Sequence, residues 1–179
     1  ISKKKSKLSI PSSDFILLTL HRAENVDNKK ILSSIIKGLI DSNQNIIFPI
    51  HPRTKKRLYE FGLFNKLYQN KNIQILDAVG YFEILELMKN CSFIITDSGG
   101  IQEEATSPMI RKKVLVVRKT TDRPESVESN MAEIIGLDNK NISNSIKKTM
   151  KNPKLHSRKT PYGKGDASER ILKILKRNF

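Results

Sequence analysis

The feature that most constrains this sequence is a repeated order of short apolar runs and amphipathic stretches. Residues 15–20 are apolar at all but one position, without the alternation of a strand that has one face in water. Residues 30–41 then place Ile31, Ile35 and Leu39 at helical spacing. Because helices that connect parallel strands cover both faces of the sheet, this order predicts an α/β fold with a Rossmann-like parallel sheet and helices on both faces.

The same order recurs along the chain and predicts a single domain over residues 1–179. The stretch 152–166, which contains prolines and glycines, is expected to be an irregular crossing. We expect further strands at 45–50, 73–76, 93–96, 114–117 and 133–136, and further helices at 55–60, 81–88, from Ile101 onward, at 141–150 and at 167–176.

Charge and aromatic content bear on nucleic-acid binding. Lysine and arginine exceed the acidic residues enough to give a formal net charge of +15, which favours anionic partners. The basic residues are dispersed toward both ends of the chain, with Lys3, Lys4, Lys5 and Lys7 at the start, and only 6% of residues are aromatic. Because no base-stacking platform is indicated, we expect a solvated, lysine-rich surface and no nucleic-acid partner.

Other class signals are sparse. No apolar run approaches the roughly 20 residues that span a bilayer, and residues 1–5 lack the apolar stretch of a signal peptide. We therefore expect a soluble, cytoplasmic protein without a membrane partner. The single cysteine, Cys91, excludes an internal disulfide and offers no metal cluster, so we expect a packed thiol and no metal site.

Polar and glycine-containing segments follow several of the predicted strands. Ligands of an open parallel sheet bind at the edge formed by the carboxyl ends of its strands. We therefore expect these segments to face one common edge: 21–25, 51–53, 97–100 and 118–125.

The turn Ser98-Gly99-Gly100 lies between a predicted strand and a predicted helix. Small residues at this position let backbone N–H groups approach a phosphate at the positive end of the helix. The alternative is that Asp97 or Ser98 caps the helix while the glycines form a tight turn. The turn alone does not decide between an anion site and a cap.

Two adjacent carboxylates, Glu103 and Glu104, follow in the first turns of that helix. Successive helix positions point in different directions. Glu104 is therefore free to accept hydrogen bonds from ribose hydroxyls while Glu103 supports a neighbouring loop. Equally, both residues can simply complement the helix dipole.

Three further residues carry possible chemistry. Arg123 offers a fork of donors to a diphosphate, unless Asp122 only caps a helix that begins at Pro124. His21 can donate to a phosphate or exchange a proton near neutral pH, or it can order its own loop. His51 is a weaker candidate, because the proline that follows it is well placed to begin a helix.

Taken in order, these motifs resemble the C-terminal domain of the non-hydrolysing UDP-N-acetylglucosamine 2-epimerases. The resemblance covers most of the chain and is specific as a set, with Asn130 standing where the family commonly has glycine. It implies one lobe of a two-lobed, glycosyltransferase-B-like architecture. The motifs that carry it lie at 19–25, 96–105, 120–125 and 162–165.

The resemblance also implies roles for single residues. His21 becomes a catalytic residue beside the departing diphosphate. Arg22 and His51 match positions that hold a second, activating molecule of substrate in bacterial relatives, and so form an effector pair. The substrate-binding residues are implied to be Ser98, Gly99 and Gly100 for the diphosphate, Glu104 for the ribose and Arg123 for the phosphate region.

The implied reaction interconverts UDP-N-acetylglucosamine and UDP-N-acetylmannosamine by loss of the C2 proton with elimination of UDP, followed by re-addition of UDP. It requires no cofactor. The family's proton-transferring acidic residues lie in an N-terminal lobe that we expect to be absent from this chain, so the isolated chain should be inactive. The full-length protein is expected to be a homodimer.

Two alternatives stay open. The chain is also compatible with the donor-binding lobe of a UDP-sugar glycosyltransferase, which has the same architecture. The second alternative is a non-catalytic module that binds a UDP-sugar or nucleic acid.

Overall fold

A computed structural model describes residues 14–155, 157, 159–163 and 165–178, so the basic lead-in at Lys3–Lys5 and Lys7 lies outside the described residues. Within them the chain forms a six-stranded, wholly parallel sheet in the order β3-β2-β1-β4-β5-β6. The predicted parallel sheet is thereby confirmed. The strands are β1 (Ile16–Thr19), β2 (Ile46–Pro49), β3 (Ile73–Leu76), β4 (Ile94–Thr96), β5 (Val114–Val116) and β6 (Ala132–Ile134).

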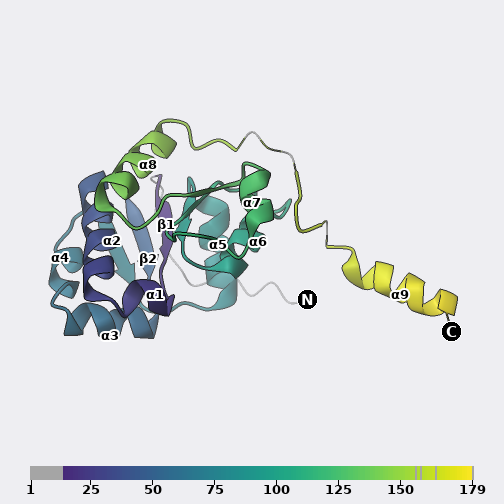
Figure 1. The fold of residues 1–179 in the computed structure, drawn as a ribbon, viewed down its shortest axis with the longest axis horizontal. Helices are drawn as coiled ribbons and strands as arrows, with labels where there is room; N and C mark the ends of the chain where they lie inside the picture. Colours follow the sequence, from purple (N-terminus) through teal and green to yellow (C-terminus); the bar gives the residue numbers. More distant parts are fainter. Residues whose placement is uncertain (1–13, 156, 158, 164, 179) are drawn as a thin grey trace.

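Helices connect the strands, and most were predicted (Figure 1). The sequence did not predict the short helices α1 and α4, and a helix beginning at Pro124 was raised only as an alternative. The helices are α1 (Ala23–Val26), α2 (Lys29–Ser42), α3 (Pro52–Glu60), α4 (Phe64–Tyr68), α5 (Tyr81–Asn90), α6 (Gly99–Ala105), α7 (Pro124–Glu128), α8 (Asn139–Lys151) and α9 (Ala167–Asn178).

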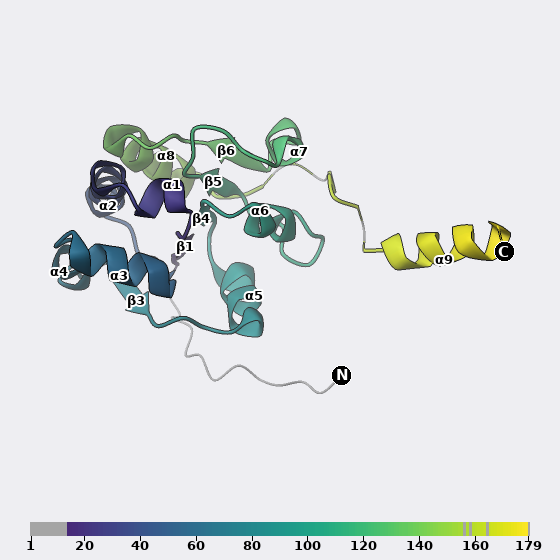
Figure 2. The ribbon, with the colours of Figure 1, turned by 60° about the horizontal axis from the view of Figure 1, so that its bottom comes forward.

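Both faces of the sheet are buried, as the unbroken apolar runs predicted. In β1, Ile16 and Leu18 point into one apolar cluster, which α2 and α8 complete. Leu17 and the preceding Phe15 point into a second cluster with α5 and α6. Figure 2 shows α2 and α8 on one side of the chain fold and α5 on the other. All four side chains are at most 2% exposed, which explains why this strand has no polar alternation.

A close helix contact joins α2 and α8 at Gly38. A Cβ atom at this position would lie 2.8 Å from the carbonyl oxygen of Asn139 and 2.8 Å from Cβ of Ile142. Both neighbours belong to α8, and one of them is backbone. Glycine therefore sets how closely these two helices approach.

Two further residues illustrate how local chemistry fits the fold. Asn130 follows α7 with φ of 59°, the left-handed conformation that favours glycine and tolerates asparagine. Cys91 is 1% exposed, and burial raises the pKa of its thiol to about 12. The prediction of a packed thiol is confirmed.

The chain ends in a helix that lies apart from the sheet. Figures 1 and 2 both show α9 at the end of an extended segment, well away from the other helices. The described residues of 152–166 form neither helix nor strand, as predicted. No helix in the described part of the chain is long and apolar enough to cross a membrane. Large apolar side chains of α9 are exposed: Ile171, Leu172, Ile174 and Leu175.

We predict that Gly38→Ala lowers the free energy of unfolding by about 1–2 kcal/mol, measured by urea denaturation. Overpacking against α8 costs about 1–3 kcal/mol, and the better helix propensity of alanine returns less than about 1 kcal/mol. Lys30→Ala on the exposed side of α2 is the control and should change stability by less than about 0.5 kcal/mol. A Gly38→Ala variant more stable than the parent would show that the helices are not in close contact.

Candidate functional site

The candidate site lies where the strand order reverses. β1 and β4 are neighbours at the centre of the sheet, and the chain continues from them in opposite directions across it. Their last residues, Thr19 and Thr96, are paired in register, with hydroxyl oxygens 2.6 Å apart. The loops that follow these two strands therefore leave the sheet side by side, which is the arrangement that forms a ligand crevice in open α/β sheets.

Asp97 joins these two loops. It follows β4 and is 0% exposed. Its carboxylate accepts hydrogen bonds from the backbone N–H of His21, at 3.1 Å to each oxygen, and from that of Arg22 at 2.9 Å. The side-chain amide of Asn25 donates to the same carboxylate at 3.2 Å. These bonds hold the loop after β1 against the end of β4.

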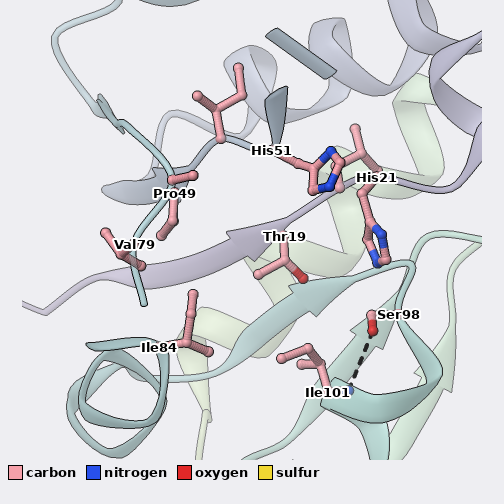
Figure 3. Close-up of a pocket in the computed structure, with 11 residues that line it drawn as sticks. Thr19, His21, Pro49, His51, Val79, Ile84, Ser98 and Ile101 are labelled. Atoms are coloured by element: carbon pink, nitrogen blue, oxygen red, sulfur yellow. Dashed lines mark hydrogen bonds between the residues drawn. The ribbon is translucent and has the colours of Figure 1, made fainter. Parts of the chain in front are cut away.

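A pocket of about 210 Å³ opens at this edge. Figure 3 shows the rings of His21 and His51 near one another at one side of it, with Ser98 below His21. The two ring centroids are 5.7 Å apart. Much of the remaining lining is apolar: Leu20, Pro49, Ile50, Ala78, Val79, Ile84 and Ile101, with Thr19 between the two sides.

The turn at Ser98 caps α6 and also leaves backbone N–H groups without a partner in the helix. The Oγ atom of Ser98 accepts from the N–H of Ile101 at 3.5 Å, so Ser98 is the cap that the alternative interpretation foresaw. The N–H of Ser98 itself donates to Oγ1 of Thr96 at 2.9 Å. Gly99 and Gly100 form the first turn of α6, where the helix offers their N–H groups no carbonyl partner. These two glycines carry the donors that an anion would meet.

Arg123 lies over this turn. A Cβ atom on Gly99 would lie 3.6 Å from the guanidinium carbon of Arg123, which is ordinary van der Waals contact, so the guanidinium packs against this glycine. The guanidinium forms an ion pair with Glu103, which is the loop-supporting role suggested for that carboxylate. A buried side chain of α6, Gln102, fixes the loop further by accepting from Oγ1 of Thr121 at 2.7 Å.

A charged network adjoins Arg123. Arg118 is 7% exposed and donates to Asp122 at 2.8 Å and to Glu24 at 2.9 Å. The hydrogen bond from Arg118 lowers the pKa of Asp122, and the same bond raises the pKa of Arg118. Arg22 also donates to Asp122, at 3.1 Å. Asp122 therefore binds arginines, and the interpretation of it as a helix cap is wrong, because α7 has no side-chain cap.

His51 and Arg53 point in different directions. His51 is the residue before α3, and its Nδ1 accepts from the N–H of Arg53 at 3.2 Å, so the proline that follows does begin a helix. The ring still lines the pocket. The side chain of Arg53 pairs with Asp27 and, together with Arg57, lowers the pKa of that carboxyl to about 2. The side chain of Arg53 therefore binds the residue that follows α1.

Glu104 differs from its neighbour Glu103. Its Oε2 atom is buried and has no hydrogen-bond partner among the described residues. Burial raises the pKa of this carboxyl, and the charge of Glu103 raises it further. An unsatisfied acceptor of this kind is costly unless a donor occupies it. Glu104 is therefore poised to accept a hydrogen bond.

The structure brings some of the implied site residues together and separates others. His21, His51 and Ser98 share the pocket lining. Five other implied residues lie outside it: Arg22, Gly99, Gly100, Glu104 and Arg123. His51 was assigned with Arg22 to an effector pair, but in space it is the neighbour of His21. The described residues contain no group of three His, Cys, Asp or Glu side chains arranged for a metal.

Sequence reasoning missed two residues that build the site. Asp97 was considered only as a helix cap, and Gln102 was given no role, yet Asp97 ties the loop after β1 to the end of β4 and Gln102 ties the loop after β5 to α6. A polar residue next to a predicted strand end was the only available signal, and it does not reveal a partner so distant in sequence. In the last motif, Lys164 lies outside the described residues, and Tyr162 donates to Glu125 of α7 at 3.3 Å.

The sequence and fold have clear relatives. A profile of the UDP-N-acetylglucosamine 2-epimerase family matches residues 1–176. The UDP-N-acetylglucosamine 2-epimerase of Methanocaldococcus jannaschii is 48% identical over 166 residues, which are 90% of this chain and 44% of that protein. The chain thus spans about half the length of the curated relatives it matches.

Solved structures agree. The epimerase of the same organism in complex with UDP-GlcNAc and UDP is 46% identical with a TM-score of 0.82, over 92% of this chain and 45% of that one. The UDP-GlcNAc 2-epimerase of Neisseria meningitidis bound to UDP-GlcNAc is 31% identical with a TM-score of 0.78, again over 92% and 45%. The family profile covers nearly the whole sequence, and the chain therefore belongs to the UDP-N-acetylglucosamine 2-epimerase family.

Proposed function

We propose that this chain is the UDP-binding lobe of a UDP-N-acetylglucosamine 2-epimerase. The observation that carries the proposal is the convergence of His21, Ser98 and the Arg123 loop at the point where the strand order reverses. A relative of 46% identity is solved with UDP-GlcNAc and UDP, which supports the same ligand class here. The glycine N–H groups and Arg123 would bind the diphosphate, and the buried acceptor of Glu104 would receive a ribose hydroxyl.

The size of the pocket supports an incomplete site. Pockets for small ligands usually enclose about 300–1,000 Å³. The pocket beside His21 holds about 210 Å³, too little for a whole nucleotide sugar. Its apolar side, with Val79 and Ile84, suits a flat ring such as a base. The rest of the ligand would lie in the open until a second lobe closes over it.

A preceding N-terminal lobe is part of the proposal. The relatives have about twice the length of this chain, and α9 exposes a set of apolar side chains that a partner lobe would cover. In the proposed reaction a base removes the C2 proton, the C1–O bond breaks, and its electron pair leaves with UDP. UDP then adds back to the unsaturated sugar, and a proton returns to C2 from the opposite side.

This chain would supply the leaving-group half of that chemistry. His21 and Ser98 line the same pocket, which supports a role for His21 in donating a proton or a hydrogen bond to the departing diphosphate. The base would come from the other lobe. We further propose that the full-length protein is a homodimer that uses a nucleotide sugar as substrate, with Arg22 and His51 as an effector pair. A cytoplasmic location stays a prediction.

We predict that the chain binds UDP weakly and that Arg123→Ala weakens UDP binding at least tenfold, measured by calorimetric titration. Hydrogen bonds to charged groups contribute about 1.5–3 kcal/mol, and about 1.4 kcal/mol corresponds to tenfold. Arg170→Ala on α9 removes the same charge far from the site and should leave the affinity within twofold. No UDP binding by the parent, or an unchanged affinity in Arg123→Ala, would refute the assignment.

Glu104 gives a second prediction, on pH. Because its pKa is raised, the carboxylate is lost at a higher pH than that of an ordinary glutamate. Ribose hydroxyls donate to the ionised form, so the preference for UDP over 2′-deoxy-UDP should fall as the pH falls through this pKa. Comparing the two nucleotides cancels the titration of their phosphates. Glu104→Gln should show a small preference that does not vary with pH. A preference that is constant in the parent would exclude Glu104 as the ribose acceptor.

A further inference from the structure

We propose that Asp97 is a positioning residue that presents His21 to the diphosphate site, an inference that rests on the proposed UDP-binding function. Asp97 lies directly before Ser98 of the candidate anion-binding turn and is fully buried. It cannot touch a ligand from there. Its carboxylate acts instead through the loop after β1, which carries His21.

The contacts of Asp97 are all donors. The backbone N–H groups of His21 and Arg22 and the amide of Asn25 converge on its two oxygens at 2.9–3.2 Å. Such a set matches a carboxylate, which only accepts, and does not match an amide, which would turn an NH₂ group toward at least one N–H. These hydrogen bonds offset the free-energy cost of burying the carboxylate. If the loop moved, the carboxylate would lose its donors, so the bonds favour one position of the loop.

The imidazole of His21 lies beside the same carboxylate. Its Nε2 is 3.7 Å from Oδ1 of Asp97, too far for a hydrogen bond. In the described part of the chain, no other basic side chain lies within 4.0 Å of that carboxylate. The backbone of His21 is therefore bonded to Asp97, and its ring is the basic side chain next to that residue.

Asn25 extends the connection to a third strand end. Its Nδ2 donates to Asp97 and, at 2.8 Å, to the carbonyl oxygen of Val117, the residue after β5. Both of its N–H groups are used in this way, while its Oδ1 is buried without a partner among the described residues. Asn25 is thus oriented by donation alone, and the loops after β1, β4 and β5 are joined through Asp97.

The test is Asp97→Asn in the full chain, followed by NMR with UDP as the probe. The proton resonances of the His21 and Arg22 amides should move upfield, because their bonds to a charged acceptor are lost. UDP affinity should fall roughly tenfold. In a His21→Ala background the same substitution should change the affinity less than twofold, because the residue that it positions is already gone.

The control is Ser42→Ala, which removes a buried hydrogen bond of 2.6 Å to the carbonyl of Leu39 at the end of α2. It should lower stability and leave both amide resonances and UDP affinity unchanged. Unmoved amides in Asp97→Asn, or a tenfold loss that persists in the His21→Ala background, would overturn the proposal.

Two complications have defined consequences: the variant can fail to fold, or the parent chain can fail to bind UDP. If Asp97→Asn does not fold, Asn25→Ser serves as the second variant, because it removes one donor to the carboxylate. It should shift the amide resonance of His21 and weaken UDP binding a few-fold. No change in either quantity would overturn the proposal. If the parent chain binds no UDP, the proposed function fails, and the amide resonances alone decide whether Asp97 holds the loop.

Discussion

The burial of both faces of a parallel sheet is the constraint on which the rest of the structure depends. The four central strands, β1, β2, β4 and β5, are buried and apolar up to their last residues. Only the edge strands β3 and β6 carry long polar side chains, Gln74 and Glu133. Near the centre of the sheet, polar groups therefore gather where the strands end. Because all strands run the same way, their carboxyl ends meet at one edge. The site is therefore a consequence of the same rule that forms the core.

The edge is organised by a few buried polar side chains. Asp97 ties the loop after β1 to β4, and Gln102 ties the loop after β5 to α6. Each is 0% exposed, and each makes its bonds to residues that are distant in sequence. The partly exposed residues that would contact a ligand, such as His21 and Arg123, lie next to these buried side chains in the fold. The backbone of His21 is bonded to the buried Asp97, whereas the side chain of Arg123 is paired with the partly exposed Glu103.

How far the sequence predicts this arrangement follows from the range of the forces involved. Apolar periodicity is local, so every strand and the long helices were predicted to within a few residues. Short helices such as α1 and α4 depend on tertiary contacts and carry too little periodicity to predict. The polar loops could be placed at one edge of the sheet from the positions of the predicted parallel strands alone. The sequence could not predict the partner of Arg123, the proximity of His51 to His21 or the bonds of Asp97, because each of these contacts joins residues that are separated in the chain.

The ion pair of Arg123 with Glu103 has a consequence for selectivity. A chain with a net charge of +15 attracts every anion in its surroundings. At Arg123 an incoming anion must first replace a carboxylate that is already in place. A weakly charged or singly bound anion gains little from that exchange, whereas a ligand that also bonds the glycine N–H groups gains several contacts at once. At the proposed diphosphate site, the pairing of Arg123 with Glu103 would therefore favour anions that make several contacts over simple, singly bound ones.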